Sequence, residues 1–247
     1  MMSSASVGSI LNHPPMLHKI EEARAVISNF AGIDLAAPPS IKSDGIGVHR
    51  VPLVVATAQS LQGYGHPVQD FATGCVTIVT WPQPGWRPVV PGTGNEGGTV
   101  EDVFEMVRRG DILHAVNHAV GRSYITGWFG DPATASETET STGSRSILTH
   151  EANYHPDGGQ IFSPRDGAAF VALLAKPGDD LTPGDFVAFY CDGSFGLHID
   201  PGVWHQPVFP INDRARFDNR QGRVHCCIAV DFITEFGCYL EVPLALD

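Results

Sequence analysis

The sequence predicts an all-β domain of the sandwich or jelly-roll type, preceded by a helical segment. Among its 247 residues, 27 Gly and 19 Pro indicate many short elements joined by turns. From Gly47 onward, short apolar runs rich in β-branched and aromatic residues are each bounded by Gly, Pro or Asp. A hydrophobic content of 43% supplies enough material for a packed core.

The predicted strands recur at a spacing that suits a jelly roll. We expect them in VHRVPLVVA (48–56), CVTIVTW (75–81), SYITGWF (123–129), FVALLA (170–175), DFVAFY (185–190) and VHCCIAVDF (224–232). In the last run, apolar residues occupy alternate positions and leave His225 and Asp231 on the other face. We expect that second face to line a cavity, with Asp231 in it.

Helices are expected at two places. In PPMLHKIEEARAVISNF (14–30), Leu17, Ile20 and Ile27 have helical spacing. In TVEDVFEMVRR (99–109), Thr99 can cap a helix that would end at Gly110 and carry Val103, Phe104 and Val107 as an apolar stripe.

The Pro- and Ser-containing stretch DLAAPPSIKSDG (34–45) reads as a linker. The sequence therefore predicts an N-terminal appendage over residues 1–45 and a main domain over residues 46–247.

The charge balance points to a small-molecule partner. A net charge of -12 with only 15 Lys and Arg argues against binding to nucleic acid, which needs clustered cations. An anionic ligand would therefore need a local cluster of donors. No apolar run approaches about 18 residues, and no basic-then-apolar leader is seen, so neither a membrane span nor a secretory signal is expected. Five Cys without a CxxC pair suggest buried free thiols in a reducing, cytoplasmic compartment.

Two short stretches carry most of the residues that could do chemistry. One is HEANYHPDGGQIFSP (150–164), and the other is FGLHIDPGVWHQPVFP (195–210). Asp200, Pro201 and Gly202 read as a tight turn between two extended segments, which would aim His205 at a definite place.

The spacing of these residues resembles the paired motifs of the cupin superfamily. His155, Gln160 and Gly167 stand as H-x4-Q-x6-G, and Pro201, Gly202 and His205 stand as P-x-G-x2-H. The resemblance implies a small β-barrel with one or two short helices, in which the two motifs converge on a metal site. Asn153 and Gln160 stand where the superfamily has a histidine and a glutamate, and amides are weaker ligands than those groups.

A narrower resemblance is to the ureidoglycolate lyase family, also called ureidoglycolate hydrolase. It rests on H-E-x3-H-P-x-G-x-Q-x-F-x-P at 150–164, V-W-H-x-P at 203–207, and the FVALLA and IAVDF segments, and it covers residues 110–242 most clearly. Asp200 is a departure, because relatives commonly have a histidine five positions before the last His of V-W-H. The resemblance implies cleavage of ureidoglycolate to glyoxylate and urea in allantoin breakdown, by a homodimer.

The resemblance also implies roles for individual residues. We expect His205 and His155 to act as acid and base or as metal ligands, and Asp200 to tune one imidazole. The expected substrate-binding residues are Gln160, Asn117, Arg122, His150, Trp204 and Asp231. A divalent metal such as nickel or zinc, if bound, would be held by His155, Gln160 and His205, with His198 or His150 as a fourth ligand; no organic cofactor is expected.

Two other functions remain open from the sequence. A non-catalytic cupin that binds a small carboxylate would retain the pocket while its amides replace acid and base groups. A different metal-dependent cupin enzyme would need at least three strong ligands.

Overall fold

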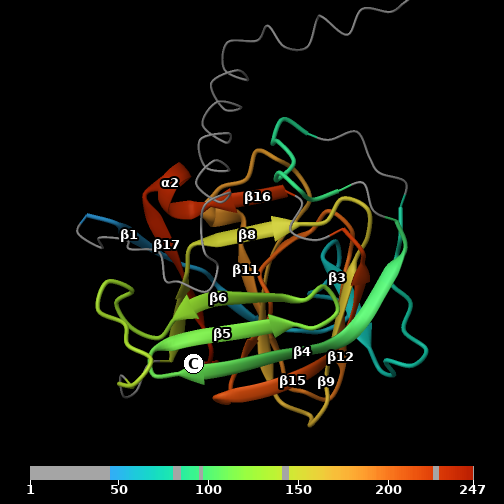
Figure 1. Cartoon of the computed structure of the whole chain (residues 1–247), viewed down its shortest axis with the longest axis horizontal. Coiled ribbons are helices and arrows are strands. Elements are labelled where there is room, and N and C mark those ends of the chain that lie inside the picture. Colours follow the sequence, from blue (N-terminus) through green and yellow to red (C-terminus); the bar gives the residue numbers. More distant parts are fainter. Residues whose placement is uncertain (1–44, 80–84, 95–96, 141–144, 225–227, 247) are drawn as a thin grey trace, which may run out of the picture.

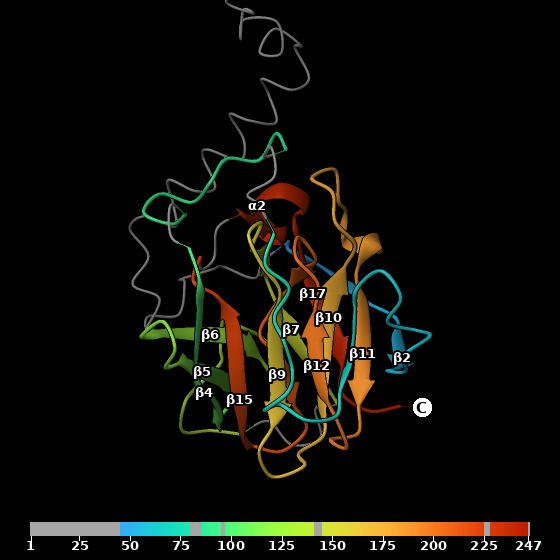
Figure 2. The same cartoon turned by 90° about the vertical axis from the view of Figure 1, so that its right-hand side faces the viewer.

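The computed structural model describes residues 45–79, 85–94, 97–140, 145–224 and 228–246, and these form two β-sheets that face each other (Figures 1 and 2). The predicted all-β class is confirmed, because the described helices are one α-helix and one 3-10 turn, at Pro183–Asp185. No helix in the described part of the chain is long and apolar enough to cross a membrane. The predicted N-terminal helix and its linker fall almost entirely outside the described residues, so the domain boundary stays a prediction.

The larger sheet has ten strands in the order β1-β17-β7-β6-β5-β4-β15-β9-β12-β3. Its strands are β1 (Gly47–Arg50), β3 (Gly65–Val68), β4 (Thr99–Arg109), β5 (Ile112–Asn117), β6 (Arg122–Trp128), β7 (Ser146–Thr149), β9 (Gln160–Pro164), β12 (Gly196–Ile199), β15 (Arg214–Gly222) and β17 (Cys238–Pro243). Neighbouring strands are antiparallel except β1 and β17.

The smaller sheet runs β16-β8-β13-β10-β11-β2, with β14 paired to β10. Its strands are β2 (Leu53–Val55), β8 (Glu151–Tyr154), β10 (Phe170–Ala175), β11 (Val187–Cys191), β13 (Trp204–His205), β14 (Phe209–Pro210) and β16 (Ile228–Asp231). The central strand β10 is buried along its whole length.

Aromatic side chains from both sheets fill the space between them. Phe162 of β9 packs edge-on against Phe104 of β4 at a centroid distance of 5.3 Å, and Phe217 of β15 packs edge-on against Phe170 of β10 at the same distance. All four rings are buried. Edge-to-face packing of this kind contributes about 0.5–1.5 kcal/mol per pair beyond burial alone.

The helix predicted over Thr99–Arg109 is wrong, because this segment is the long strand β4. It pairs with β15 over nine residues and with β5 on its other side. Phe104 and Met106 are the fully buried positions, two residues apart as in a strand. Pairing with two neighbours therefore overrides the weaker helical stripe and the capping signal at Thr99.

Most of the other predicted strands are confirmed, with differences in two runs. Residues 75–79 make only an isolated bridge, from Ile78 to Gly158, and no strand. The run 224–232 contributes the strand β16, while Phe232 begins the helix α2 (Phe232–Phe236), which Gly237 ends with φ 66°. The expectation of buried thiols holds for Cys191 but not for Cys75, which is exposed, or for Cys238, which is half-buried.

The predicted turn between the two extended segments of 195–210 is present. The N–H of Val203 bonds to the carbonyl of Asp200, and Gly202 has φ 77°, which glycine adopts without strain. This turn moves the chain from β12 in one sheet to β13 in the other. It thereby separates the two histidines of the stretch, His198 and His205.

Close packing between β6 and β7 leaves no space for a side chain at Gly127. A Cβ atom there would lie 2.5 Å from the backbone oxygen of Leu148. We expect Gly127→Ala to lower the free energy of unfolding by about 1–3 kcal/mol in urea denaturation. The control Gly97→Ala meets no atom within 4 Å and should change stability by less than about 0.5 kcal/mol. Equal stability of the two variants would contradict this account of the packing.

Candidate active site

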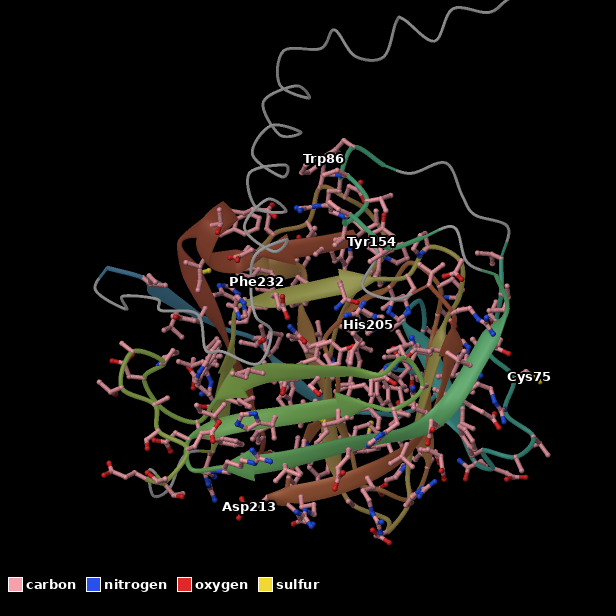
Figure 3. The ribbon with its side chains drawn as sticks, viewed as in Figure 1. Cys75, Trp86, Tyr154, His205, Asp213 and Phe232 are labelled. Carbon is pink, nitrogen blue, oxygen red and sulfur yellow. The ribbon has the colours of Figure 1, made fainter. Side chains whose placement is uncertain are left out.

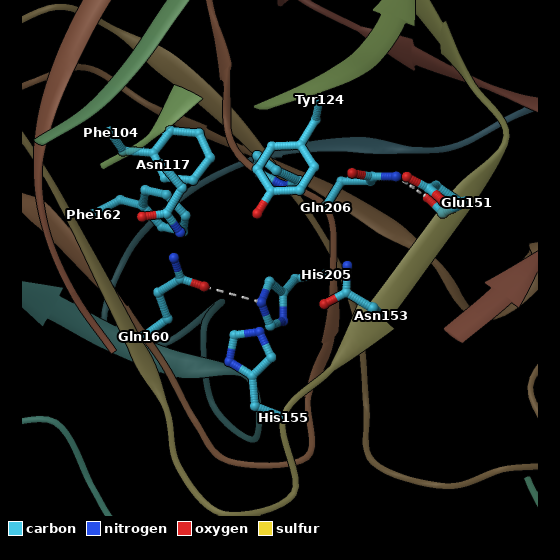
Figure 4. Close-up of a pocket in the computed structure, with 11 residues that line it drawn as sticks. Phe104, Asn117, Tyr124, Glu151, Asn153, His155, Gln160, Phe162, His205 and Gln206 are labelled. Atoms are coloured by element: carbon cyan, nitrogen blue, oxygen red, sulfur yellow. Dashed lines mark hydrogen bonds between the residues drawn. The ribbon is translucent and has the colours of Figure 1, made fainter. Parts of the chain in front are cut away.

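A small cavity lies between the two sheets, next to the paired aromatic rings. Figure 3 places His205 near the middle of the molecule, between β8 and β6. The residues that line the cavity are Phe104, Asn117, Tyr124, Glu151, Asn153, His155, Gln160, Phe162, His205, Gln206 and Pro207 (Figure 4). Both dense stretches of the sequence therefore meet in one space.

Strand β8 and the residue that follows it present three polar side chains to the cavity by simple alternation. Glu151, Asn153 and His155 lie on the same side of the chain, two residues apart. Burial raises the pKa of the Glu151 carboxyl, and the nearby Asp231 raises it further, whereas His150 and a hydrogen bond from Gln206 oppose the shift. The Gln206 side chain also donates to the backbone oxygen of Glu151. The carboxyl is thus placed to hold a proton at a higher pH than an exposed glutamate does.

His205 enters from β13, which pairs with β8 so that His205 stands opposite Asn153. Its Nδ1 donates to the backbone oxygen of Val203 at 2.8 Å, and its Nε2 lies 3.3 Å from Oε1 of Gln160. Its ring is edge-on to that of His155, with centroids 5.0 Å apart. Burial lowers the pKa of His205 to about 4, although the bond to Val203 opposes this shift.

Four buried amides gather at one end of the cavity. Asn117 and Gln160 line it, and Asn219 and Gln221 of β15 stand behind them with no exposed surface. Hydrogen bonds between 2.7 and 3.3 Å join the four side chains.

Six of the residues expected in the site do not line the cavity, and His198 and Asp200 are two of them. On β12, Leu197 and Ile199 belong to the core, so His198 points to the opposite face. Nδ1 of His198 lies 3.2 Å from Oδ1 of Asp200, and the ring stacks on His66 at 4.5 Å. Asp200 therefore lies beside the imidazole of His198, where it opposes the lowering of the His198 pKa by burial.

The remaining expected residues have other surroundings. Arg122 lines a separate surface groove that also includes Arg223. Trp204 is fully buried and donates from Nε1 to the carbonyl of Gly178, on the opposite side of β13 from His205. His150 packs against Trp128 with a centroid distance of 5.5 Å, and the Asp231 carboxylate caps α2 by accepting from the N–H of Thr234.

The cavity side chains do not fit a resident divalent metal well. Its imidazoles, His155 and His205, are accompanied by the neutral amides Asn153 and Gln160. Among the described residues, the Glu151 carboxyl does not join these imidazoles in a group with metal-ligand spacing. We therefore derive no step through a metal in this cavity.

Within the described ranges, the group with metal-like spacing is His66, His198 and Asp200, outside the cavity. There the backbone N–H of Thr77 donates to Nε2 of His198. The hydrogen of the neutral ring is therefore on Nδ1, which faces Asp200 and has no free lone pair.

Sequence reasoning did not assign site roles to several cavity residues. Glu151 could have been predicted as a cavity residue, because it lies an even number of positions from Asn153 and His155 and therefore faces the same side of an extended chain. Asn219 and Gln221 lie on a strand that was not predicted, and their signal is that they continue the buried face of Phe217 with polar side chains. Tyr124 and Gln206 give no such signal in the sequence.

Two facing sheets that enclose paired histidines define a cupin-like protein. A family model described as Ureidoglycolate lyase matches residues 140–226. A ureidoglycolate lyase of Stutzerimonas stutzeri is 41% identical over 63 residues, which cover 26% of this chain and 37% of that protein. A ureidoglycolate lyase of Salmonella paratyphi B is 31% identical over 112 residues, which cover 44% of this chain and 69% of that protein. The chain belongs to the ureidoglycolate lyase family.

Burial of His205 as a neutral ring predicts a loss of stability in acid. The unfolded chain binds a proton at this histidine below about pH 6.5, whereas the folded chain does so only near pH 4. Its contribution to stability is therefore complete above pH 6.5 and is lost as the pH falls toward 4.

We expect wild type to lose about 2–3 kcal/mol more than His205→Asn between pH 7 and pH 4.5, measured by urea unfolding. Parallel losses in the two proteins would show that His205 is not buried in the neutral form.

Proposed function

We propose that this chain cleaves ureidoglycolate to glyoxylate and urea by acid/base elimination. Family membership supports the substrate, and the cavity that contains His155, His205 and Glu151 supports the type of chemistry. In the substrate, one carbon carries a hydroxyl, a carboxylate and a nitrogen of urea. A base removes the hydroxyl proton as the C=O bond forms, the C–N bond breaks, and an acid protonates the departing nitrogen.

His205 is the base in this proposal. Because its Nδ1 donates to the carbonyl of Val203, the neutral ring has its lone pair on Nε2, which faces the cavity. Its pKa is low in the free cavity, but a bound substrate carboxylate would favour the protonated ring and raise that pKa. The geometry of Nε2 is the observation that carries the proposal.

Glu151 is the acid in this proposal. Its raised pKa favours the protonated carboxyl, which can donate to the urea nitrogen. The proton taken up by His205 then returns to Glu151 before the next turnover, so that the cycle balances. A lowered pKa for the imidazole favours its base form, and a raised pKa for the carboxyl favours its acid form.

Neutral donors would hold the substrate. None of the described residues that line the cavity is Lys or Arg. The carboxylate and the urea oxygen would therefore be bound by N–H and O–H groups of Asn153, His155, Tyr124 and Gln206. We infer that Arg122, in its groove outside the cavity, does not contact the bound substrate.

The cellular setting extends the proposal. Release of urea and glyoxylate places the reaction in the breakdown of allantoin. We also propose a cytoplasmic location and a homodimer, both of which accord with the family resemblance of the sequence.

The proposal predicts release of glyoxylate and urea from racemic ureidoglycolate by the purified protein. We expect chelation, or later addition of nickel or zinc, to change the rate by less than about twofold, because the cavity offers a weak ligand set. Loss of release on chelation, restored by metal, would contradict the metal-free mechanism. Binding of glyoxylate without turnover would instead support a carboxylate-binding protein.

Two variants locate the chemistry in the cavity. His205→Asn and Glu151→Gln should each lower kcat by about 10²-fold or more, with little change in thermal stability at pH 7. The exposed control Glu139→Gln should leave kcat unchanged. Wild-type turnover in His205→Asn would remove this histidine from the mechanism.

A further inference from the structure

The four buried amides of the cavity form a hydrogen-bonded chain with a defined direction. The oxygen and nitrogen of an amide can be exchanged by rotation, so the direction needs a fixed starting point. A backbone N–H gives one, because it can only donate. The N–H of Ala119 donates to Oδ1 of Asn117 at 3.1 Å.

This first bond fixes the orientation of each amide that follows. With its oxygen toward Ala119, Asn117 turns its NH2 group to Oε1 of Gln221 at 2.8 Å. Oδ1 of Asn117 also accepts from the NH2 group of Asn219 at 3.3 Å. Asn219 must therefore turn its own oxygen toward Gln160, whose NH2 group donates to it at 2.7 Å.

Gln160 is held twice, because its NH2 group also donates to Gln221 at 3.2 Å. Rotation of the Gln160 amide would place its oxygen against two acceptors, Oδ1 of Asn219 and Oε1 of Gln221. An unmade hydrogen bond in a buried site is costly, so the reversed orientation is disfavoured. The Gln160 oxygen consequently faces Nε2 of His205 at 3.3 Å.

We propose that Asn117 and Asn219 are positioning residues that hold the Gln160 amide in the one orientation that presents its oxygen, and not its NH2 group, to Nε2 of His205. In the neutral ring, this oxygen faces a lone pair at 3.3 Å, and the contact becomes a hydrogen bond when Nε2 gains a proton. Gln160 is then a preorganised acceptor for the imidazolium that forms during the reaction. This catalytic consequence rests on the proposed lyase function, whereas the direction of the hydrogen bonds between the four amides does not.

The hydrogen bonds between the four amides also explain why residue 160 is a glutamine. A carboxylate there would set oxygen against the oxygens of Asn219 and Gln221, whereas a glutamine supplies two N–H donors. The other titratable side chains that share the cavity with His205 are His155, Glu151 and Tyr124.

The test is an NMR titration of His205 ring nitrogens in protein labelled with 15N-histidine. In Asn219→Ala, we expect the midpoint of Nε2 protonation to move to lower pH by about 0.5–1 unit, because the oxygen of Gln160 is no longer held in place. Asn117→Ala, one step further along the chain, should move it in the same direction. The control Thr126→Val loses a buried side-chain bond to Leu113 without touching the amides, and should not move it.

The second measurement is the steady-state kinetics of the same variants. Asn219→Ala should lower kcat about tenfold with KM within about twofold, and Thr126→Val should retain wild-type values. An unshifted midpoint in both amide variants, or an equal kinetic loss in Thr126→Val, would overturn the positioning role. If wild type releases no glyoxylate, the proposed function fails, and the titration still decides whether the amide chain acts on His205.

Discussion

The pairing of β8 with β13, which sets Asn153 opposite His205, is the contact on which the site depends. The two strands come from stretches about fifty residues apart, and the pairing brings the alternating side chains of one next to the imidazole of the other. The turn after Asp200 makes this possible by carrying the chain from the larger sheet to the smaller one. Without that crossing, His205 would stay on the same sheet as His198 and could not pair with Asn153.

The polarity and charge of the cavity are set by the side chains that line it. Its described walls include aromatic rings and amides. Burial raises the pKa of Glu151 and lowers that of His205, and His155 is buried beside them. A space of this kind favours a small polar anion held by N–H donors over a metal cation held by charged ligands. The acid/base account and the amide chain both follow from this property.

Much of the fold could be predicted from the sequence, because alternation and turn residues are local signals. β10, β6 and the turn at Asp200–Gly202 were predictable for that reason, whereas β4 was not, since its partners β15 and β5 decide its conformation. In the site, the two motifs correctly bring His155, Gln160 and His205 together. The direction of His198, away from the cavity, follows from its neighbours Leu197 and Ile199. The contact between Asn219 and Gln160 depends on strand pairing that no local pattern reveals.

The most direct test of the central claim is the turnover of Gln160→Glu. This variant restores the carboxylate of the superfamily motif while it replaces the two N–H donors that hold the amide chain together. The account predicts that kcat for ureidoglycolate falls about tenfold or more and that added nickel or zinc does not restore it. Wild-type turnover in this variant, or turnover that becomes dependent on metal, would contradict the claim that an amide-held histidine carries the reaction.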